Sequence, residues 1–217
     1  MIILDNISVE YNNRIILKNV NMYCMAWQIT ILEWPNGWWK SSVFKIIVWN
    51  NKKYSWKVIF NETDNIFDVN YYKNNSFNNR IFWYLPQNNL LFEHLTCYEN
   101  IEILFQWSWY KYKVKELNYY LKYFKLEKIM NNYPHEISLG QKQLIAFIRT
   151  ILIDSQYLLL DEPTSALNIE NINKVKNIIL ELKKLNKTVL IISHDKYFSE
   201  SISDKNYYIS DWSIIKK

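Results

Sequence analysis

EWPNGWWKSS, residues Glu33 to Ser42, joins the apolar run QITIL, which predicts a strand, to the run SSVFKIIV, which predicts a helix. A strand, a turn and a helix that opens with Lys-Ser form the setting of a phosphate-binding loop, whose pattern is G-x-x-x-x-G-K-[ST]. Here the two glycine positions hold Trp34 and Trp39, followed by Lys40 and Ser41. Such a loop turns backbone N–H groups toward the anion and has no room for an indole. Either the chain has lost nucleotide binding, or the printed tryptophans misreport the protein.

The composition favours the second explanation. The chain has two glycines, Gly37 and Gly140, beside ten tryptophans, whereas glycine usually makes up about 7% of a protein. Several tryptophans stand where a turn needs glycine, as in A-W-Q, Y-S-W-K-V and D-W-S. Our hypothesis is that most or all are glycines, encoded by UGA in a lineage that reads this codon as glycine. Real tryptophans in the core are the alternative, which suits one or two positions better than ten.

Length and charge exclude several classes of protein. The 217 residues suit one domain with a substantial core. The net charge of +5 is mild and forms no dense basic stripe, so no nucleic-acid partner is expected. No apolar run approaches the roughly 18–20 residues that cross a bilayer. A membrane component would therefore come from another chain. Cys24 and Cys97, without a signal peptide, are expected to be reduced, packed cysteines.

The N-terminal part of the chain predicts an antiparallel sheet. Short strands are expected at residues 2–4, 7–11 and 14–20, and the Asn12-Asn13 pair marks a hairpin turn between the last two. A further strand is expected at 57–60, after the phosphate-binding loop and its helix.

The rest of the chain predicts a parallel α/β sheet. Residues 61–80 are polar and rich in Asn, which indicates a surface loop, and a strand follows at 81–85. From about 88 to 136 the pattern is helical, with Thr96 and Glu99 as a capping box. Apolar residues recur on one helix face at Val114, Leu117, Leu121 and Phe124. Helices and strands then alternate: helices at 141–153 and around 172–182, strands at 157–160, 188–192, 207–209 and 213–215.

Two stretches carry candidate chemistry. YLLLDEP places Asp161 and Glu162 at the end of an apolar strand, where Asp161 can hold Mg²⁺ through water and Glu162 can deprotonate an attacking water. The alternative is a strand that merely ends in an acidic turn. ISLGQ supplies Ser138, Gly140 and Gln141 ahead of a helix, whose N-terminus binds anions. For this stretch, an ordinary N-cap is the alternative.

Three single residues are further candidates. Gln87 follows a strand and can reach a metal and its water, although an ordinary loop amide is the simpler explanation. His194 lies just past the strand TVLIIS, where ligands bind in open α/β sheets. Tyr11 can stack on an adenine ring, but it is one of seventeen tyrosines.

Taken together, these stretches resemble the ATP-binding cassette (ABC) ATPase family over essentially the whole chain. The signature just upstream of Walker B is the specific feature, because generic phosphate-loop ATPases lack it. The motifs follow the family's order: Walker A at Trp34–Ser41 with glycine restored, the Q-loop at Gln87, the signature ISLGQ at 137–141, Walker B at 157–162, the D-loop at Ser165–Asn168 and the switch histidine at His194. The family usually shows glycine at six of the tryptophan positions: Trp27, Trp34, Trp39, Trp56, Trp83 and Trp212.

The resemblance implies an α/β fold of the P-loop NTPase (RecA-like) type. A parallel-sheet core would carry an N-terminal antiparallel β subdomain and an inserted α-helical subdomain. The whole chain, 1–217, would be one ABC ATPase domain, with its nucleotide-binding core at 1–87 and 141–217 and its helical subdomain at about 88–140.

The same resemblance implies that two ATPase subunits, as a homodimer or heterodimer, close around ATP and Mg²⁺. Glu162 would be the base, His194 would sense the γ-phosphate, and Gln87 would join them in catalysis. Ser41, Gln87 and Asp161 would place Mg²⁺. Lys40 and the loop N–H groups would neutralise phosphate charge. The expected ATP contacts are Tyr11, Trp34, Pro35, Asn36, Gly37, Trp38, Trp39, Lys40, Ser41 and Ser42, with Ser138, Gly140 and Gln141 supplied across the dimer.

The implied function is the ATP-driven motor of a transporter, bound to transmembrane permease subunits at the inner, cytoplasmic face of the cell membrane. Departures from the family pattern are Ile137 and Leu139, which are tolerable variants of the signature, and Leu144 and Asn168, neither of which removes a group that touches phosphate or metal. One alternative is a catalytically inactive structural partner, if the Walker A tryptophans are real. A non-transport member acting on DNA or ribosomes is the last alternative, and the chain shows neither the coiled-coil insertion nor the tandem cassettes expected of one.

Overall fold

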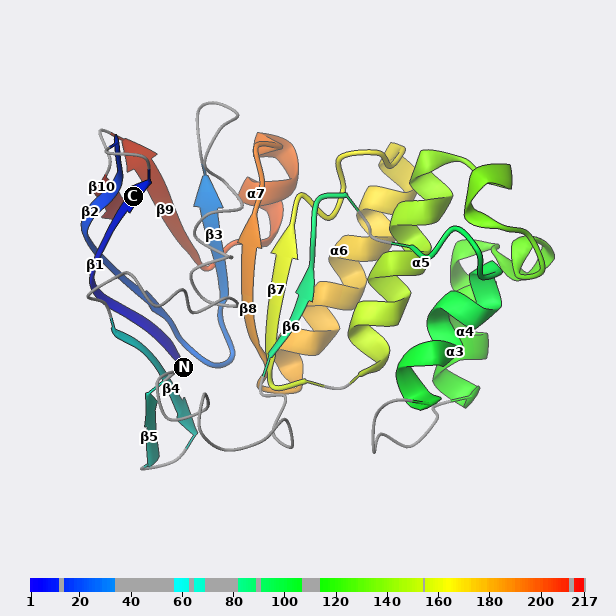
Figure 1. Ribbon diagram of the computed structural model, residues 1–217, viewed down its shortest axis with the longest axis horizontal. Helices are drawn as coiled ribbons and strands as arrows, with labels where there is room; N and C mark the ends of the chain where they lie inside the picture. The colour runs from blue at the N-terminus through cyan, green and yellow to red at the C-terminus, as the bar shows by residue number, and fades with distance from the viewer. Residues whose placement is uncertain are drawn as a thin grey trace.

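The computed structural model describes residues 1–11, 14–33, 57–62, 65–68, 82–88, 91–106, 114–153, 155–210 and 213–216. Within them the chain forms two sheets and a group of helices, with the parallel sheet lying between the antiparallel sheet and the helices (Figure 1). The predicted phosphate-binding loop, Trp34 to Ser42, lies outside the described part of the chain.

The parallel sheet is the centre of the fold. Its strand order is β10-β9-β3-β8-β7-β6, and all neighbours are parallel except the edge pair β9 and β10. Every residue of β3, β7 and β8 is buried, because both faces of this sheet are covered. The strands are β3 (Ile29–Glu33), β6 (Phe82–Leu85), β7 (Tyr157–Asp161), β8 (Thr188–Ile192), β9 (Lys205–Ser210) and β10 (Ser213–Lys216).

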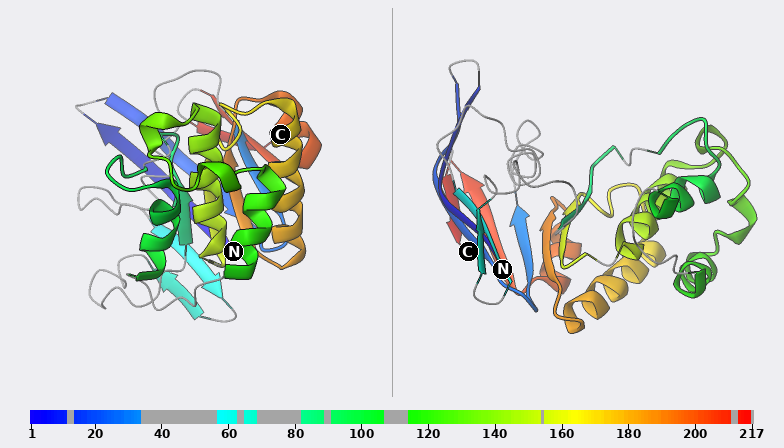
Figure 2. Two further views of the ribbon diagram at one scale, coloured as in Figure 1. Left: turned by 90° about the vertical axis from the view of Figure 1, so that its right-hand side faces the viewer. Right: turned by 60° about the horizontal axis from the view of Figure 1, so that its bottom comes forward.

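The described helices lie on one side of this sheet, and their apolar faces build the core with it. Figure 2 shows α5 and α6 next to the strands, with α3 and α4 farther out. Phe124 and Phe147 meet edge to face, with ring centroids 6.5 Å apart, and so join α4 to α5. The helices are α3 (Cys97–Gln106), α4 (Val114–Phe124), α5 (Leu139–Leu152), α6 (Ile169–Lys184) and α7 (Lys196–Ile202), with 3₁₀ turns at Glu127–Ile129 and Pro134–Glu136.

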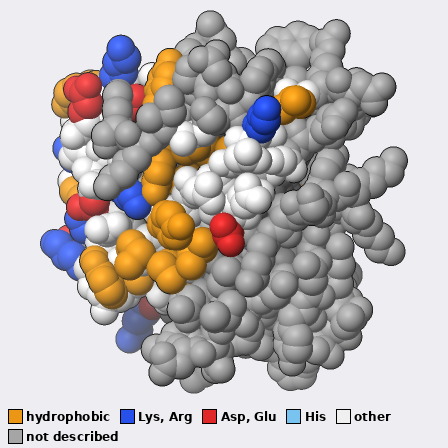
Figure 3. Space-filling model, turned by 90° about the vertical axis from the view of Figure 1, so that its left-hand side faces the viewer, with side chains coloured by type: hydrophobic (Ala, Val, Ile, Leu, Met, Phe, Trp, Pro, Cys, Tyr) orange, Lys and Arg blue, Asp and Glu red, His pale blue; other side chains and the backbone are white. Residues whose placement is uncertain are grey.

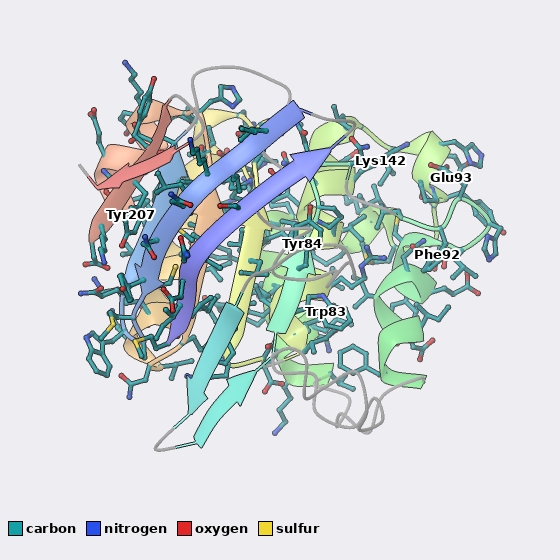
Figure 4. The ribbon with its side chains drawn as sticks, turned by 60° about the vertical axis from the view of Figure 1, so that its left-hand side comes forward. Trp83, Tyr84, Phe92, Glu93, Lys142 and Tyr207 are labelled. Atoms are coloured by element: carbon teal, nitrogen blue, oxygen red, sulfur yellow. The ribbon has the colours of Figure 1, made fainter. Side chains whose placement is uncertain are left out.

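The antiparallel sheet has the order β2-β1-β4-β5. Pairing of Tyr11 with Arg14 agrees with the predicted hairpin turn between them. Figure 3 shows this side of the molecule, with hydrophobic side chains gathered in one band of the described surface. The β9 side chain Tyr207 (Figure 4) accepts a hydrogen bond from the Tyr23 N–H at 3.1 Å, which ties the two sheets together. The strands are β1 (Ile2–Tyr11), β2 (Arg14–Cys24), β4 (Lys57–Glu62) and β5 (Asn65–Asp68).

Several predicted boundaries were wrong. The strands expected at 2–4 and 7–11 are one strand, β1, whose register shifts between Leu4 and Ile7 near Asn6, a residue with φ of 50°. The expected loop 61–80 contains β5, which pairs with β4. Val114 is exposed although its predicted helix face is otherwise buried. Helix α7 had no counterpart in the sequence prediction.

Candidate active site at the carboxyl end of the parallel sheet

Five parallel strands end at one edge of the sheet, and the candidate residues follow four of them, β3, β8, β7 and β6. The register aligns Leu32 with Ile192, Ile192 with Asp161, and Leu85 with Leu160. The residues that follow these strand ends therefore lie along the same edge, where open α/β sheets bind ligands. The arrowheads of these strands mark this edge in Figure 1. It receives the chain leaving β3 before Trp34.

Glu162 and His194 meet at this edge, one after β7 and one after β8. The Glu162 carboxylate Oε1 lies 2.7 Å from His194 Nδ1, and the His194 backbone N–H points at Oε2 from 3.5 Å. Glu162 is 1% exposed, whereas the His194 side chain is 60% exposed. A buried carboxylate thus has an imidazole partner on its solvent side, which suits a base that must be held in place yet reached from outside.

The backbone of Glu162 is strained and held at both ends. Its φ is 51°, in the left-handed region, which costs a residue other than glycine about 1–3 kcal/mol. The Glu162 N–H donates to the Ile192 carbonyl at 2.9 Å, and its carbonyl accepts from Gln143 Nε2 at 2.7 Å. Strain of this kind is typical of functional sites, where the surrounding contacts maintain it.

Asp161 is buried beside Glu162 and receives a hydrogen bond from the preceding strand. The Tyr84 hydroxyl of β6 donates to Asp161 Oδ2 at 3.3 Å. Burial, reinforced by the Asp161 charge, raises the pKa of Tyr84, so its phenol stays protonated and remains a donor. Figure 4 shows Tyr84 with its neighbour Trp83 on β6. Gln87 lies in the exposed turn after this strand, at the same edge.

The signature residues form the start of α5. Ser138 is the N-cap: its Oγ accepts from the Gln141 N–H at 3.3 Å, and its own N–H donates to Gln141 Oε1 at 2.9 Å. The N-cap interpretation is thus confirmed, and an anion-binding role stays a prediction. A Cβ on Gly140 would lie 2.8 Å from the carbonyl oxygen of Ala166. Glycine is therefore required here because the first turn of α5 packs directly on the loop after β7.

Residues 91–96, which lead into α3, are held by side chains of both α3 and α5. The buried Asn100 side chain donates to the carbonyls of Phe92, Leu95 and Thr96 and accepts from the Phe92 N–H at 2.7 Å. Glu93 Oε1 lies 3.7 Å from Lys142 Nζ of α5 (Figure 4). This exposed ion pair adds little energy. The buried amide is what fixes the segment between the Q-loop and α3.

Two residues of this site were missed by the sequence analysis. Tyr84 contacts Asp161, and its only sequence signal is its position three residues before Gln87. Gln143 is 1% exposed and contacts the chain at Glu162, Ser165 and Ala166. A lone amide ahead of the apolar run LIAFI was the available signal for it, because a buried amide needs partners.

The predicted site residues that the structure describes lie in three places. Asp161, Glu162, His194 and Gln87 lie at one sheet edge. The signature residues lie at the start of α5, which contacts the loop after Glu162. Tyr11 ends β1 in the other sheet, and its side chain is not among those described. The Walker A candidates lie outside the described residues: Trp34, Pro35, Asn36, Gly37, Trp38, Trp39, Lys40, Ser41 and Ser42.

The described helices include none with the length and apolar character needed to span a membrane. Across the same described ranges, His, Cys, Asp and Glu side chains form no cluster of three that could hold a metal ion.

Comparisons with known proteins agree on one family. The family described as ABC transporter matches residues 17–165. A probable ABC transporter ATP-binding protein of Campylobacter jejuni is 25% identical over the whole chain and 90% of the relative. A spermidine/putrescine import ATP-binding protein of Mycoplasma mycoides is 29% identical over 93% of this chain and 56% of the relative.

Solved structures agree with this assignment. The dimeric structure of a bacterial ABC transporter cassette has a TM-score of 0.82 at 25% identity, covering all of this chain and 98% of the other. An ATP-binding subunit of an ABC transporter gives a TM-score of 0.86 at 20% identity, covering all of this chain and 89% of the other. The predicted P-loop NTPase fold class is confirmed. The chain belongs to the ABC transporter family, as an ATP-binding subunit with the ATPase function that its motifs predict.

Proposed function

We propose that this chain hydrolyses ATP at the carboxyl end of its parallel sheet, with Glu162 as the base that takes the proton of the attacking water. The observation that carries the proposal is the Glu162–His194 contact of 2.7 Å between the ends of two adjacent parallel strands. The buried carboxylate can accept the proton, while the exposed imidazole is open to a γ-phosphate bound at this edge. Phosphoryl transfer needs mainly such positioning and charge stabilisation.

The composite site needs a second subunit, in a homodimer or heterodimer. Lys40 and the loop N–H groups bind the β- and γ-phosphates in one subunit, with Tyr11 against the adenine. Ser138, Gly140 and Gln141 of the other subunit close over the same ATP. Because Ser138 Oγ already accepts from the Gln141 N–H, its hydroxyl hydrogen is available for a phosphate oxygen. The N-terminus of α5 adds its partial positive charge.

Mg²⁺ fits the residues present. Asp161 offers a carboxylate, Gln87 an amide oxygen and Ser41 a hydroxyl, all of the oxygen type that Mg²⁺ prefers. This set has a single carboxylate, which matches the habit of Mg²⁺ of keeping waters and phosphate oxygens as its other ligands. When bound, the ion would neutralise charge on the phosphates.

The proposal includes glycine at most or all of the tryptophan positions. Support comes from Trp27, which has a φ of 54° in the turn before β3 and is exposed. A bulky aromatic residue in the left-handed region is an outlier, whereas glycine adopts this conformation without steric cost. At Trp34 and Trp39, glycine gives the loop its phosphate site. The alternative, in which this chain is an inactive structural partner, has less support, because an inactive chain has no need to keep a strained Glu162 against His194.

The subunit powers transport through transmembrane permease subunits and sits on the cytoplasmic face of the membrane as a peripheral protein. Its nucleotide-binding core comprises residues 1–87 and 141–217, and the helical part at about 88–140 contacts the permease. The buried Asn100 supports a helical part that moves as one piece, because its hydrogen bonds hold residues 92–96 against the start of α3.

ATP binding to the glycine-containing protein tests the site. We expect Lys40→Ala to abolish or gravely weaken ATP binding measured by calorimetry, since it removes the cation that faces the phosphates. Lys184→Ala, at an exposed lysine of α6, is the control and should bind ATP like the parent. Tight ATP binding by the Lys40 variant would contradict the site assignment.

A further inference from the structure

We propose that Gln143 is a positioning residue that holds the catalytic loop around Glu162 in its working conformation and links it to the signature helix. This inference rests on the proposed ATPase function. The Gln143 side chain contacts the backbone of Glu162, whereas the Glu162 carboxylate takes part in the reaction.

The Gln143 amide spans the turn that follows β7. Its Nε2 donates to the Glu162 carbonyl at 2.7 Å and to Ser165 Oγ at 3.2 Å, and its Oε1 accepts from the Ala166 N–H at 2.8 Å. Both hydrogens and the oxygen of one amide are thus in use. Because Gln143 is 1% exposed, water cannot replace these contacts.

The turn needs such a clamp, because Glu162 has a φ of 51°. Strained backbone persists only where several contacts determine it. The Glu162 N–H is fixed on the Ile192 carbonyl, and Gln143 supplies the matching contact on the carbonyl side. Without this contact the peptide after Glu162 can rotate and carry the carboxylate away from His194.

The clamp also joins two parts of the dimeric site. Gln143 lies on α5, the helix that begins with the signature residues. Near the start of this helix Gly140 packs so closely against Ala166 that a Cβ on Gly140 would lie 2.8 Å from the Ala166 carbonyl oxygen. A shift of α5 on contact with the ATP of the other subunit would therefore reach Glu162 through the Gln143 amide.

Two substitutions separate positioning from simple packing. Gln143→Leu keeps much of the volume and removes every hydrogen bond. Gln143→Glu keeps the shape and the acceptor but loses both donors while its carboxyl is ionised. When that carboxyl is protonated, its O–H can again donate to the Glu162 carbonyl. Burial raises the pKa of the introduced carboxyl, so this recovery falls within reach of neutral pH.

The steady-state ATPase rate of the full glycine-containing chain is the readout. For Gln143→Leu we expect kcat to fall about 10²-fold, the loss that a misplacement of about 1 Å in an active site can cause. The dissociation constant of ATP should stay within about threefold, since the clamp does not contact nucleotide. For Gln143→Glu, the ratio of parent to variant kcat should shrink from pH 8 to pH 6. Measuring the parent at each pH cancels the titration of other groups.

Gln156→Leu is the matched control. The Gln156 Nε2 also donates to a backbone carbonyl, that of Asn186 at 2.9 Å, but at the opposite end of the sheet. Its kcat should equal that of the parent. Circular dichroism gives the folded fraction of each variant, so that rates refer to folded protein.

The outcomes are distinct. A folded Gln143→Leu variant that turns over at the parent rate overturns the inference. If this variant fails to fold, Gln143→Glu decides, because a protonated Glu is isosteric with Gln and allows folding at pH 6. A parent-to-variant ratio that does not change with pH then overturns the inference. A parent without ATPase activity would overturn the proposed function itself, which the parent assay reveals on its own.

Discussion

The two ends of the parallel sheet both contain hydrogen-bonded polar side chains, but they use them differently. At the amino end, Lys187 donates to the Ser155 carbonyl at 2.8 Å, and Gln156 donates to the Asn186 carbonyl. At the carboxyl end, the contacts converge on Glu162, a carboxylate paired with an exposed imidazole. Polar groups at the amino end complete turns, whereas those at the carboxyl end hold a reactive group in place.

Backbone strain follows the same division. Asn186, at the amino end, has a φ of 60°, and Glu162, at the carboxyl end, has a φ of 51°. Asn186 follows helix α6, where a left-handed Asn is a common and inexpensive helix ending. Glu tolerates this region poorly, and in this chain its neighbours keep it there. The left-handed backbone of Asn186 therefore costs little energy, whereas that of Glu162 is maintained by hydrogen bonds from its neighbours.

The sharpest test of the difference is Glu162→Gln. The amide keeps the shape and the left-handed backbone but cannot accept the proton of water. We expect kcat for ATP to fall about 10³-fold, within the range for a general base. ATP affinity should be retained, and the closed dimer should accumulate in sedimentation experiments. Glu181→Gln on exposed α6 is the control. Turnover by the Glu162 variant at the parent rate would show that Glu162 is not the base.

Lys187→Met probes the amino end. It removes the charged Nζ donor from the hydrogen bond to the buried Ser155 carbonyl, which costs about 1–3 kcal/mol. The thermal midpoint should fall by about 5 °C, from about 2–4 °C for each kcal/mol in a chain of this size. The rate per folded molecule should not change. A large loss of kcat without a loss of stability would erase the proposed division between the two ends.

Gly140→Ala probes the contact between α5 and the loop after β7. Its Cβ would lie 2.8 Å from the Ala166 carbonyl, so the helix or the loop must move, at a cost of about 1–2 kcal/mol. Unlike Lys187→Met, this change should lower both the thermal midpoint and kcat, because the displaced loop carries Glu162. Leu139→Ala, at the exposed neighbouring position, should keep the parent midpoint. Equal midpoints in both variants would remove the close-packing account of Gly140.

Cys24 lies outside both ends, and it predicts a small effect of pH on stability. Burial raises the pKa of its thiol from 9.0 to about 12. Above pH 9 the unfolded chain therefore binds fewer protons than the folded one, and the free energy of unfolding falls as pH rises. At pH 10 the loss from this thiol should be about 1 kcal/mol relative to pH 8. Urea unfolding of the parent and of Cys24→Ala at both pH values measures it. The same fall in both proteins would exclude Cys24 as its source.

The sequence predicted the parallel sheet well because its strands are short continuous apolar runs. Thr188–Ile192 was predicted with its observed bounds, and β7 was missed by one residue, Asp161. Strand β5 was missed because its stretch is polar and rich in Asn, and it is a strand through pairing with β4. The prediction divided β1 into two strands at Asn6, because the register shift there changes which residues alternate between the two faces of the sheet.

The sequence predicted the motif residues of the site but not the side chains that hold them in place. Asp161, Glu162 and His194 follow apolar runs, so their common edge could be predicted from the parallel topology alone. The contacts of Gln143 and Tyr84 join residues far apart in the chain, and nothing local specifies their partners. The left-handed conformation of Glu162 was equally hidden, because residue type argues against it.

Mass spectrometry of the tryptic peptide 19–40, from protein isolated from its native source, tests whether the carboxyl end of the parallel sheet is a working phosphate site. This peptide contains four of the tryptophan positions, Trp27, Trp34, Trp38 and Trp39. We predict glycine masses at 27, 34 and 39, which would give an intact phosphate loop beside Glu162 and His194. Tryptophan at both 34 and 39 would block that loop and would contradict ATP hydrolysis by this chain.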